Sequence, residues 1–306
     1  MNTSIQVHNI SKSYNDILAL KNLSLEVNRG ELFGIIGPDG AGKTTLFRIL
    51  ATLLIQDKGE AKVEGFDVLK DYKRIRQIVG YMPGKFSLYQ DLSVEENLNF
   101  FARIFNTTIE ENYHLIEDIY KQIEPFKKRL AGRLSGGMKQ KLALSCALIH
   151  SPRVLYLDEP TTGVDAVSRK EFWEMLKRLQ KNGITILVST PYMDEASLCD
   201  RVGLMQKGVI LEINTPQGIT SQYKYPLFSV SAGNMTELVK DLRVHPEAIS
   251  AYRFGDSIHL AINPGSDSET KLDSWLKDKG YQNISIENIE AGIEDCFMAL
   301  MKNNEH

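Results

Sequence analysis

Apolar and polar residues alternate in the first part of the chain with a period of two, which is the pattern of strands. In the segments 5–7 and 23–27 every second residue is apolar. Such alternation predicts half-buried strands, and we expect these two to pair as an antiparallel edge sheet. A continuous apolar run at 32–36 follows, as expected for a strand buried on both faces.

The pattern changes to a helical period in residues 84–150. Ser93 and Glu96 have the spacing of a capping box, and the apolar residues after them recur on one side of a helix. Strand and helix then alternate, with a strand at 154–157, a helix at about 168–180 and a strand at 184–188. This order predicts a doubly wound α/β domain, whose ligand loops lie at the carboxyl ends of the strands.

A second, smaller domain is predicted after the prolines Pro216 and Pro226. Its expected elements follow a β-α-β-β-α-β order, which is that of a ferredoxin-like split βαβ unit. They are a strand at 227–231, a helix at 235–242, a hairpin of 250–254 with 257–262, a helix at 271–279 and a strand at 284–289. We therefore expect one domain over 1–220, with a helical subdomain at about 84–150, and a small α+β domain over 227–306.

Composition fits a globular protein and argues against some partners. The 306 residues are 42% hydrophobic and 25% charged, which are ordinary values. A net charge of −3 gives no basic field, so we expect no nucleic-acid partner. The three cysteines are far apart and lack metal-site spacing, as expected for thiols in a reducing compartment. We expect neither a signal peptide nor a membrane-spanning helix, so membrane association would come through a partner.

The most informative stretch fills the pattern Gly-x4-Gly-Lys-Thr between the apolar run at 32–36 and a helix-like run. This is the context of a phosphate-binding P-loop, in which backbone N–H groups and a helix N-terminus face a phosphate. Lys43 is expected to reach the β- and γ-phosphates of ATP, and the Thr44 hydroxyl to bind Mg²⁺. The residues predicted to bind the nucleotide here are Gly37, Pro38, Asp39, Gly40, Ala41, Gly42, Lys43, Thr44 and Thr45.

An acidic pair follows the buried strand predicted at 154–157. Asp158 is expected to hold Mg²⁺ through water, and Glu159 to orient or deprotonate the water that attacks ATP. On this assignment Glu159 is the catalytic residue. Taken alone, the segment also fits a strand that ends in an acidic turn.

A second anion site is predicted where a serine–glycine turn opens a helix, in residues 134–140. Ser135 suits the N-cap position, and Gly136 and Gly137 follow it. Two anion sites on separate rigid elements cannot hold the same phosphate, so this site is expected to serve a phosphate on a second subunit.

These motifs, in this order, resemble the nucleotide-binding subunit of an ABC transporter over about residues 4–220. The motifs that carry the resemblance are Walker A at 37–44, the signature at 134–140, Walker B at 154–158 with Glu159, and a D-loop that reaches Asp165. The family implies head-to-tail dimers with ATP between one subunit's Walker A and the other's signature. It also implies that Tyr14 stacks on adenine, although an ordinary edge-strand tyrosine is the alternative. The C-terminal part resembles the extension of drug- and polysaccharide-exporter ATPases.

The chain departs from the family at two positions. Gly84 stands where the Q-loop has glutamine, and Pro191 stands where the H-loop has histidine. Neither residue has a side chain that can donate a hydrogen bond. Loss of one such donor typically lowers a rate by about 10²–10³, so hydrolysis at this subunit's own site is expected to be slow. Water or Gln90 could compensate.

The resemblance thus implies the ATP-binding subunit of an exporter, an ATPase that uses ATP and Mg²⁺ to drive a separate membrane permease. We expect a second ATP-binding subunit, with a heterodimer favoured over a homodimer, and a peripheral location at the cytoplasmic face of the membrane. Phe86 and Tyr89 either form part of the permease-docking socket or are core aromatics. The alternatives are a soluble ABC ATPase acting in repair or translation, and a structural ATP-binding module with little hydrolysis.

Overall fold

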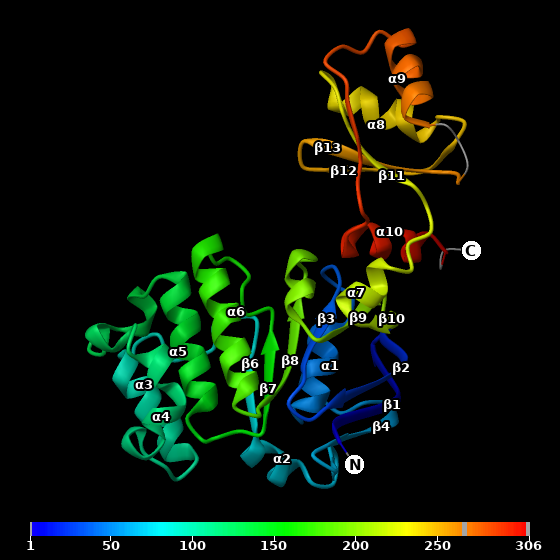
Figure 1. Ribbon diagram of the computed structural model, residues 1–306. Coiled ribbons are helices and arrows are strands. Elements are labelled where there is room, and N and C mark those ends of the chain that lie inside the picture. The colour runs from blue at the N-terminus through cyan, green and yellow to red at the C-terminus, as the bar shows by residue number, and fades with distance from the viewer. Residues whose placement is uncertain (1, 265–267, 304–306) are drawn as a thin grey trace. The chain divides into compact units, whose positions relative to one another are not determined.

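The computed structural model describes residues 2–264 and 268–303, which form two compact units (Figure 1). The first unit ends at Pro216 and the second begins at Gln217. The first contains two sheets and most of the helices, and the second contains one sheet.

The smaller sheet of the first unit is antiparallel and has the strand order β2-β1-β4-β5. Its strands are β1 (Thr3–Tyr14), β2 (Ile17–Asn28), β4 (Lys58–Val63) and β5 (Phe66–Asp67). Ile5 pairs with Val27 and Val7 with Leu25, and all four are buried. The antiparallel pairing predicted from the alternating pattern is therefore confirmed.

The larger sheet has six strands in the order β10-β9-β3-β8-β7-β6. They are β3 (Leu32–Ile36), β6 (Val79–Met82), β7 (Val154–Asp158), β8 (Thr185–Thr190), β9 (Arg201–Gln206) and β10 (Val209–Asn214). All neighbouring pairs are parallel except β10 with β9. β3, β7 and β8 are buried at every position, which explains why their sequences are mostly apolar.

Helices complete the first unit. Those of the sheet-bearing part are α1 (Lys43–Leu50), α2 (Tyr72–Ile78), α6 (Ala166–Lys181) and the short 3₁₀ helix η3 (Asp194–Leu198). The helical lobe predicted at 84–150 contains α3 (Val94–Ile104), α4 (Ile109–Tyr120), η1 (Glu124–Phe126), η2 (Ala131–Arg133) and α5 (Gly136–Leu148). The predicted capping box is present, because Ser93 and Glu96 exchange hydrogen bonds with each other's backbone N–H groups at the start of α3.

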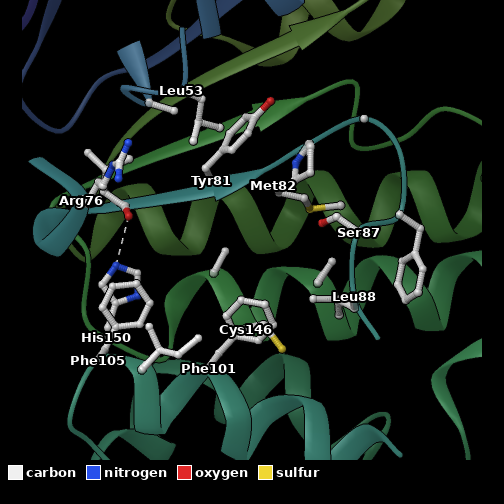
Figure 2. Close-up of a pocket in the computed structure, with 18 of the residues that line it drawn as sticks. Leu53, Arg76, Tyr81, Met82, Ser87, Leu88, Phe101, Phe105, Cys146 and His150 are labelled. Carbon is white, nitrogen blue, oxygen red and sulfur yellow. Dashed lines mark hydrogen bonds between the residues drawn. The ribbon is translucent and has the colours of Figure 1, made fainter. Parts of the chain in front are cut away.

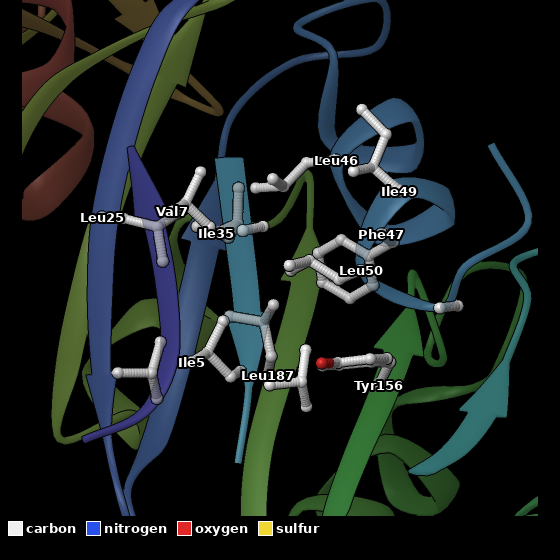
Figure 3. Close-up of a cluster of buried hydrophobic side chains, with 14 of the residues drawn as sticks. Ile5, Val7, Leu25, Ile35, Leu46, Phe47, Ile49, Leu50, Tyr156 and Leu187 are labelled. Atoms are coloured by element: carbon white, nitrogen blue, oxygen red, sulfur yellow. The ribbon is translucent and has the colours of Figure 1, made fainter. Parts of the chain in front are cut away.

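The main core lies where α1 meets both sheets (Figure 3). Ile5 and Val7 of β1 face Ile35 of β3, while Phe47 of α1 faces Tyr156 of β7. The rings of Phe47 and Tyr156 meet edge to face with centroids 6.2 Å apart. This core fixes α1, and with it the loop that precedes α1, against the end of the large sheet.

The second unit has the β-α-β-β-α-β order expected from its sequence. Its elements are β11 (Leu227–Ser231), α8 (Met235–Arg243), β12 (Ala248–Phe254), β13 (Ser257–Ile262), α9 (Ser268–Asp278) and β14 (Ser285–Asn288), flanked by α7 (Pro216–Thr220) and α10 (Ile293–Asn303). The antiparallel sheet has the order β12-β13-β11-β14. Ile258 and Leu260 of β13 share a core with Leu238 of α8 and Leu276 of α9.

The opposite face of this sheet contacts α10. His259 alternates with the core residues of β13, and its Nδ1 lies 2.7 Å from the Asp295 carboxylate of α10. The Cys296 thiol on α10 donates to the Ile219 carbonyl of α7 at 3.6 Å. Residues 217–226 therefore belong with the small unit. Throughout the described stretches, no helix combines the length and apolar character that a membrane span requires.

Candidate functional site

The loop between β3 and α1 has a backbone that only glycine adopts easily at two positions. Gly40 and Gly42 have φ angles of 77° and 106°. A Cβ on Gly42 would lie 2.5 Å from the Ala19 carbonyl oxygen, and one on Gly37 only 2.1 Å from that of Met205. The loop is therefore seated directly on the backbones of β2 and β9, as a fixed phosphate cradle requires.

The structure brings the predicted P-loop residues together at the N-terminus of α1. Pro38, Asp39 and Gly40 are exposed, Thr44 is half-buried, and Ala41 and Thr45 are buried. Gly42 is the N-cap residue of α1, and its carbonyl accepts from the Leu46 N–H at 3.1 Å. The loop therefore presents the first turn of a helix, with its free N–H groups, to an anion.

Lys43 is only 3% exposed and has three oxygen partners. Its Nζ donates to the carbonyls of Gly37 at 2.7 Å and Pro38 at 3.1 Å. The same ammonium lies 3.0 Å from Oε1 of Glu159. The predicted phosphate-binding lysine and the predicted catalytic carboxylate are thus in direct contact.

Ser189, at the end of β8, connects the two acidic residues that end β7. Its hydroxyl donates to Oδ1 of the buried Asp158 at 2.7 Å. The same Oγ accepts from the Glu159 N–H at 3.0 Å. Ser189 occupies one oxygen of Asp158 and fixes the turn in which Glu159 has a φ of 51°, an uncommon conformation for a non-glycine residue.

Sequence reasoning missed Ser189. It is aligned with Asp158 across the parallel β7–β8 pair. A hydroxyl at a strand end next to a motif carboxylate would have been a usable signal. That signal appears only once the strand order places β8 beside β7.

Position 84 lies beside the Walker B strand end. A Cβ on Gly84 would be 3.0 Å from the Asp158 carbonyl oxygen. Gln90, suggested above as a substitute, lies elsewhere, because its carbonyl accepts from the Gly132 N–H at 3.0 Å in the helical lobe. Nothing in the described part of the chain places the Gln90 side chain at this site.

Position 191 is held close to the P-loop through its neighbour Thr190. The Thr190 carbonyl accepts from the Gly37 N–H at 3.3 Å, and Pro191, which is half-buried, follows directly in the chain. Proline there contributes no donor, neither from its ring nor from its backbone.

The signature motif lies at a different place in the same unit. Ser135 caps α5 by accepting from the Met138 N–H at 3.4 Å, and both Ser135 and Gly136 are exposed. A Cβ on Gly137 would meet the Ser168 hydroxyl at 2.8 Å, so the motif packs against the start of α6. In the described residues, no hydrogen bond or ion pair joins this helix start to Lys43.

Tyr14 lies at the hairpin between β1 and β2, where it pairs with Ile17. It is 41% exposed. Ala19 and Leu20 further along β2 contact the P-loop at Gly42. Tyr14 is thus an accessible ring on a strand that touches the phosphate loop.

A largely apolar cavity of about 400 Å³ lies between β6, the Gly84 loop and the helical lobe (Figure 2). Phe86 lines it, whereas Tyr89 packs edge to face on Phe100 with centroids 4.8 Å apart. The other residues that line the cavity include Leu53, Arg76, Tyr81, Met82, Leu88, Phe101, Phe105, Cys146 and His150. Of the two aromatics considered for a docking socket, Phe86 faces this cavity.

Two cavity residues have displaced pKa values. Burial lowers the pKa of His150 to about 4, while its Nε2 lies 3.1 Å from the Val79 carbonyl. Burial and then the nearby Asp158 charge raise the pKa of Tyr81 to about 12, partly offset by Arg48. Tyr81 therefore lines the cavity and is also influenced by the charge of Asp158.

Comparison with known sequences gives a consistent result. The family described as ABC transporter matches residues 20–162. The chain is 40% identical over 288 residues to the "Probable multidrug ABC transporter ATP-binding protein YbhF" of Escherichia coli, covering 92% of this chain and 49% of that protein. It is 34% identical over 250 residues to the "Nod factor export ATP-binding protein I" of a Rhizobium species, covering 80% and 82%. The chain thus spans about half the length of the E. coli relative.

Solved structures also resemble much of the chain. One is cbiO1 from Clostridium perfringens, part of the transporter complex cbiONQ, with a TM-score of 0.65, 25% identity and coverage of 80% of this chain and 96% of that one. Another is a dimeric ATP-binding cassette in a post-hydrolysis state with ADP and Pi, with a TM-score of 0.63, 26% identity and coverage of 69% and 98%.

Proposed function

The chain belongs to the ATP-binding proteins of the ABC transporter family, and from that premise we propose that it powers an exporter whose membrane permease is a separate polypeptide. Relatives named for multidrug transport and Nod factor export support the export direction. The observation that carries the proposal is the convergence of Lys43, Glu159 and Asp158 at the mouth of the P-loop. We place the protein at the cytoplasmic face of the membrane, held there by the permease.

The residues at the P-loop fit MgATP. The glycine backbone that lies against β2 and β9 leaves N–H groups for phosphate oxygens, and Lys43 would neutralise the β- and γ-phosphates. Thr44 and Asp158, the latter through water, would hold Mg²⁺, and Tyr14 would stack on adenine. When bound, Mg²⁺ supplies charge that stabilises the transferred phosphoryl group. Glu159 would orient the attacking water once the phosphates have taken its place on Lys43.

The exposed start of α5 supports a head-to-tail dimer. Ser135, Gly136 and Gly137 form a capped helix N-terminus, and Ser135 and Gly136 are exposed there. We propose that it completes the nucleotide site of a second ATP-binding subunit. That subunit, or an equivalent domain, is expected to differ from this chain.

The heterodimer is favoured because the chain's own site has two deficiencies. Gly84 lies against Asp158 without a side chain, and Pro191 follows Thr190 without a donor. Each missing donor corresponds to a loss of about 10²–10³ in rate. We therefore propose that this site binds ATP and turns over slowly, while the partner's site, completed by Ser135, turns over quickly.

The cavity beside Gly84 is the proposed docking place for a cytoplasmic helix of the permease (Figure 2). Aromatic walls and few polar groups suit an apolar anchor side chain. Phe86 is one wall of this cavity, and Lys139 lies over its ring at 5.4 Å.

The test is steady-state ATP hydrolysis by the purified chain alone and after co-purification with a candidate second ATPase and permease. We expect little turnover alone and at least a tenfold increase in the complex. Fast turnover alone that is insensitive to the other subunits would contradict the proposal. MgATP binding itself is measured separately by equilibrium titration.

A further inference from the structure

Glu195 is a buried carboxylate at which several segments of the nucleotide-binding unit meet. It lies on η3, four residues after Pro191, and is 2% exposed. Its Oε2 accepts from the Thr190 hydroxyl at 2.5 Å and from the Thr161 hydroxyl at 3.0 Å. One oxygen thus joins the end of β8 to the segment that follows Walker B.

The second carboxylate oxygen faces Arg169 of α6. Nε of Arg169 lies 3.4 Å from Oε1 of Glu195, and its Nη2 lies 2.8 Å from Oδ2 of Asp194. The same guanidinium covers the Tyr192 ring at 4.5 Å. The 190–195 segment is therefore held from both ends, in contacts that do not involve the side chain of position 191.

Thr161 begins the D-loop, which runs to Asp165 at the N-cap of α6. Beyond Thr161 the loop has few internal restraints: the Val164 N–H bonds to the Thr161 carbonyl at 3.2 Å, and Thr162 and Gly163 are exposed. A fixed Thr161 side chain therefore fixes the base of the loop. A buried carboxylate suits this task, because its hydrogen bonds are charge-assisted and its loss would leave two hydroxyls without an acceptor.

We propose that Glu195 is a positioning residue for the D-loop. The 190–195 segment, which carries Pro191, would hold the D-loop in place through Glu195. The segment would then serve the nucleotide site of the partner subunit, because the D-loop lies against the signature motif proposed to complete that site: a Cβ on Gly136 would be 3.5 Å from the Gly163 carbonyl oxygen. This inference rests on the dimer of the proposed function.

Hydrogen exchange of the full-length chain with saturating MgATP tests the idea without a partner. Glu195→Ala removes the acceptor, and Thr161→Val cuts only the D-loop link. Thr190→Val cuts the β8 link and also removes the acceptor of the Tyr192 N–H. In Glu195→Ala and Thr161→Val, exchange at 161–165 should rise about ten- to a hundredfold. The variant that combines Glu195→Ala with Thr161→Val should exchange at 161–165 no faster than Glu195→Ala alone, since Glu195→Ala already breaks the contact with Thr161. Affinity for MgATP should stay within about twofold.

Asp194→Asn is the matched control, because this exposed neighbour also pairs with Arg169 but does not touch Thr161. It should leave exchange at 161–165 unchanged. A purely structural role for Glu195 would raise exchange across the whole sheet and spare the Thr161→Val variant. That result, or unchanged exchange at 161–165, overturns the inference. Loss of MgATP binding by the unmodified chain would instead refute the proposed function.

Discussion

The Lys43 ammonium lies 3.0 Å from the Glu159 carboxylate, so the two residues assigned to phosphate binding and to water activation neutralise each other. The lysine is 3% exposed and the glutamate 22%. A buried ammonium needs a partner. Binding of ATP would exchange one anion for another at Lys43 and release Glu159.

Lys43→Ala should weaken MgATP binding by about two orders of magnitude or more, because the phosphates lose their buried charge partner. Equilibrium titration with a fluorescent ATP analogue measures the effect. Lys181→Ala, an exposed lysine at the end of α6, is the control. Unchanged affinity in Lys43→Ala would show that the P-loop does not bind the nucleotide.

Glu159→Gln should reduce steady-state turnover of the full complex only modestly, because the site built on this chain is proposed to be slow. Ser135→Arg should nearly abolish turnover, since it adds bulk and charge at the helix N-terminus meant for the partner's phosphate. The control is Ser151→Arg, an exposed position beyond the other end of α5. An equal loss of steady-state turnover in Glu159→Gln and Ser135→Arg would favour a homodimer with compensating residues.

Pro191→His should raise hydrolysis at the chain's own site by at least about tenfold, because it restores one donor. Single turnovers are measured in a complex whose partner has lost its P-loop lysine. Tyr192→His, one position along, places the imidazole under Arg169 and should give no gain. Gly84→Gln should raise the hydrolysis rate less than Pro191→His does. Its Cβ would lie 3.0 Å from the Asp158 carbonyl oxygen, so the backbone must shift.

The small unit is expected to fold alone when expressed as 217–306. Residues 227–306, the boundary predicted from the sequence, lack α7 and the contact of Ile219 with Cys296. This fragment should be less stable by about 1 kcal/mol or more. Urea denaturation followed by circular dichroism compares the two. Equal stability of both fragments would show that α7 is dispensable.

His150 should make the first unit less stable in mild acid. Its folded pKa of about 4 is below the ordinary value of 6.5, so the unfolded chain takes up a proton first. The contribution of His150 to the free energy of unfolding is fully present above pH 6.5. It is lost as the pH falls toward 4, and the free energy of unfolding decreases by on the order of 3 kcal/mol in total. The free energy of unfolding, measured by urea denaturation from pH 7 to 4, should decrease less steeply for His150→Gln than for the unmodified chain. His8→Gln, an exposed position on β1, should behave like the unmodified chain.

The local motifs could be predicted from the sequence because each is formed by residues that are close together in the chain. The P-loop glycines, the capping box at Ser93 and the apolar runs of β3 and β7 each depend on nearby residues, and the structure has them where expected.

The contacts that link these motifs could not be read in the same way. Ser189 and Asp158 meet because β8 is next to β7, and Glu195 meets Thr161 across 34 positions of the chain. The Lys43–Glu159 pair likewise follows from the strand order, since α1 and β7 come together only in the folded sheet.

The central place of β3 has a consequence for synthesis of the protein. β3 lies between β8 and β9, and the Leu32 N–H bonds to Asp200, a residue 168 positions later. At about 5–20 residues per second, a ribosome takes on the order of 10–30 s to make the intervening chain. Until β8 emerges this apolar strand has no neighbour on either side, and one side stays unpaired until β9 emerges. The nascent protein therefore passes through an aggregation-prone period that ends only when β9 emerges, and a chaperone that shields 32–36 should raise its folding yield.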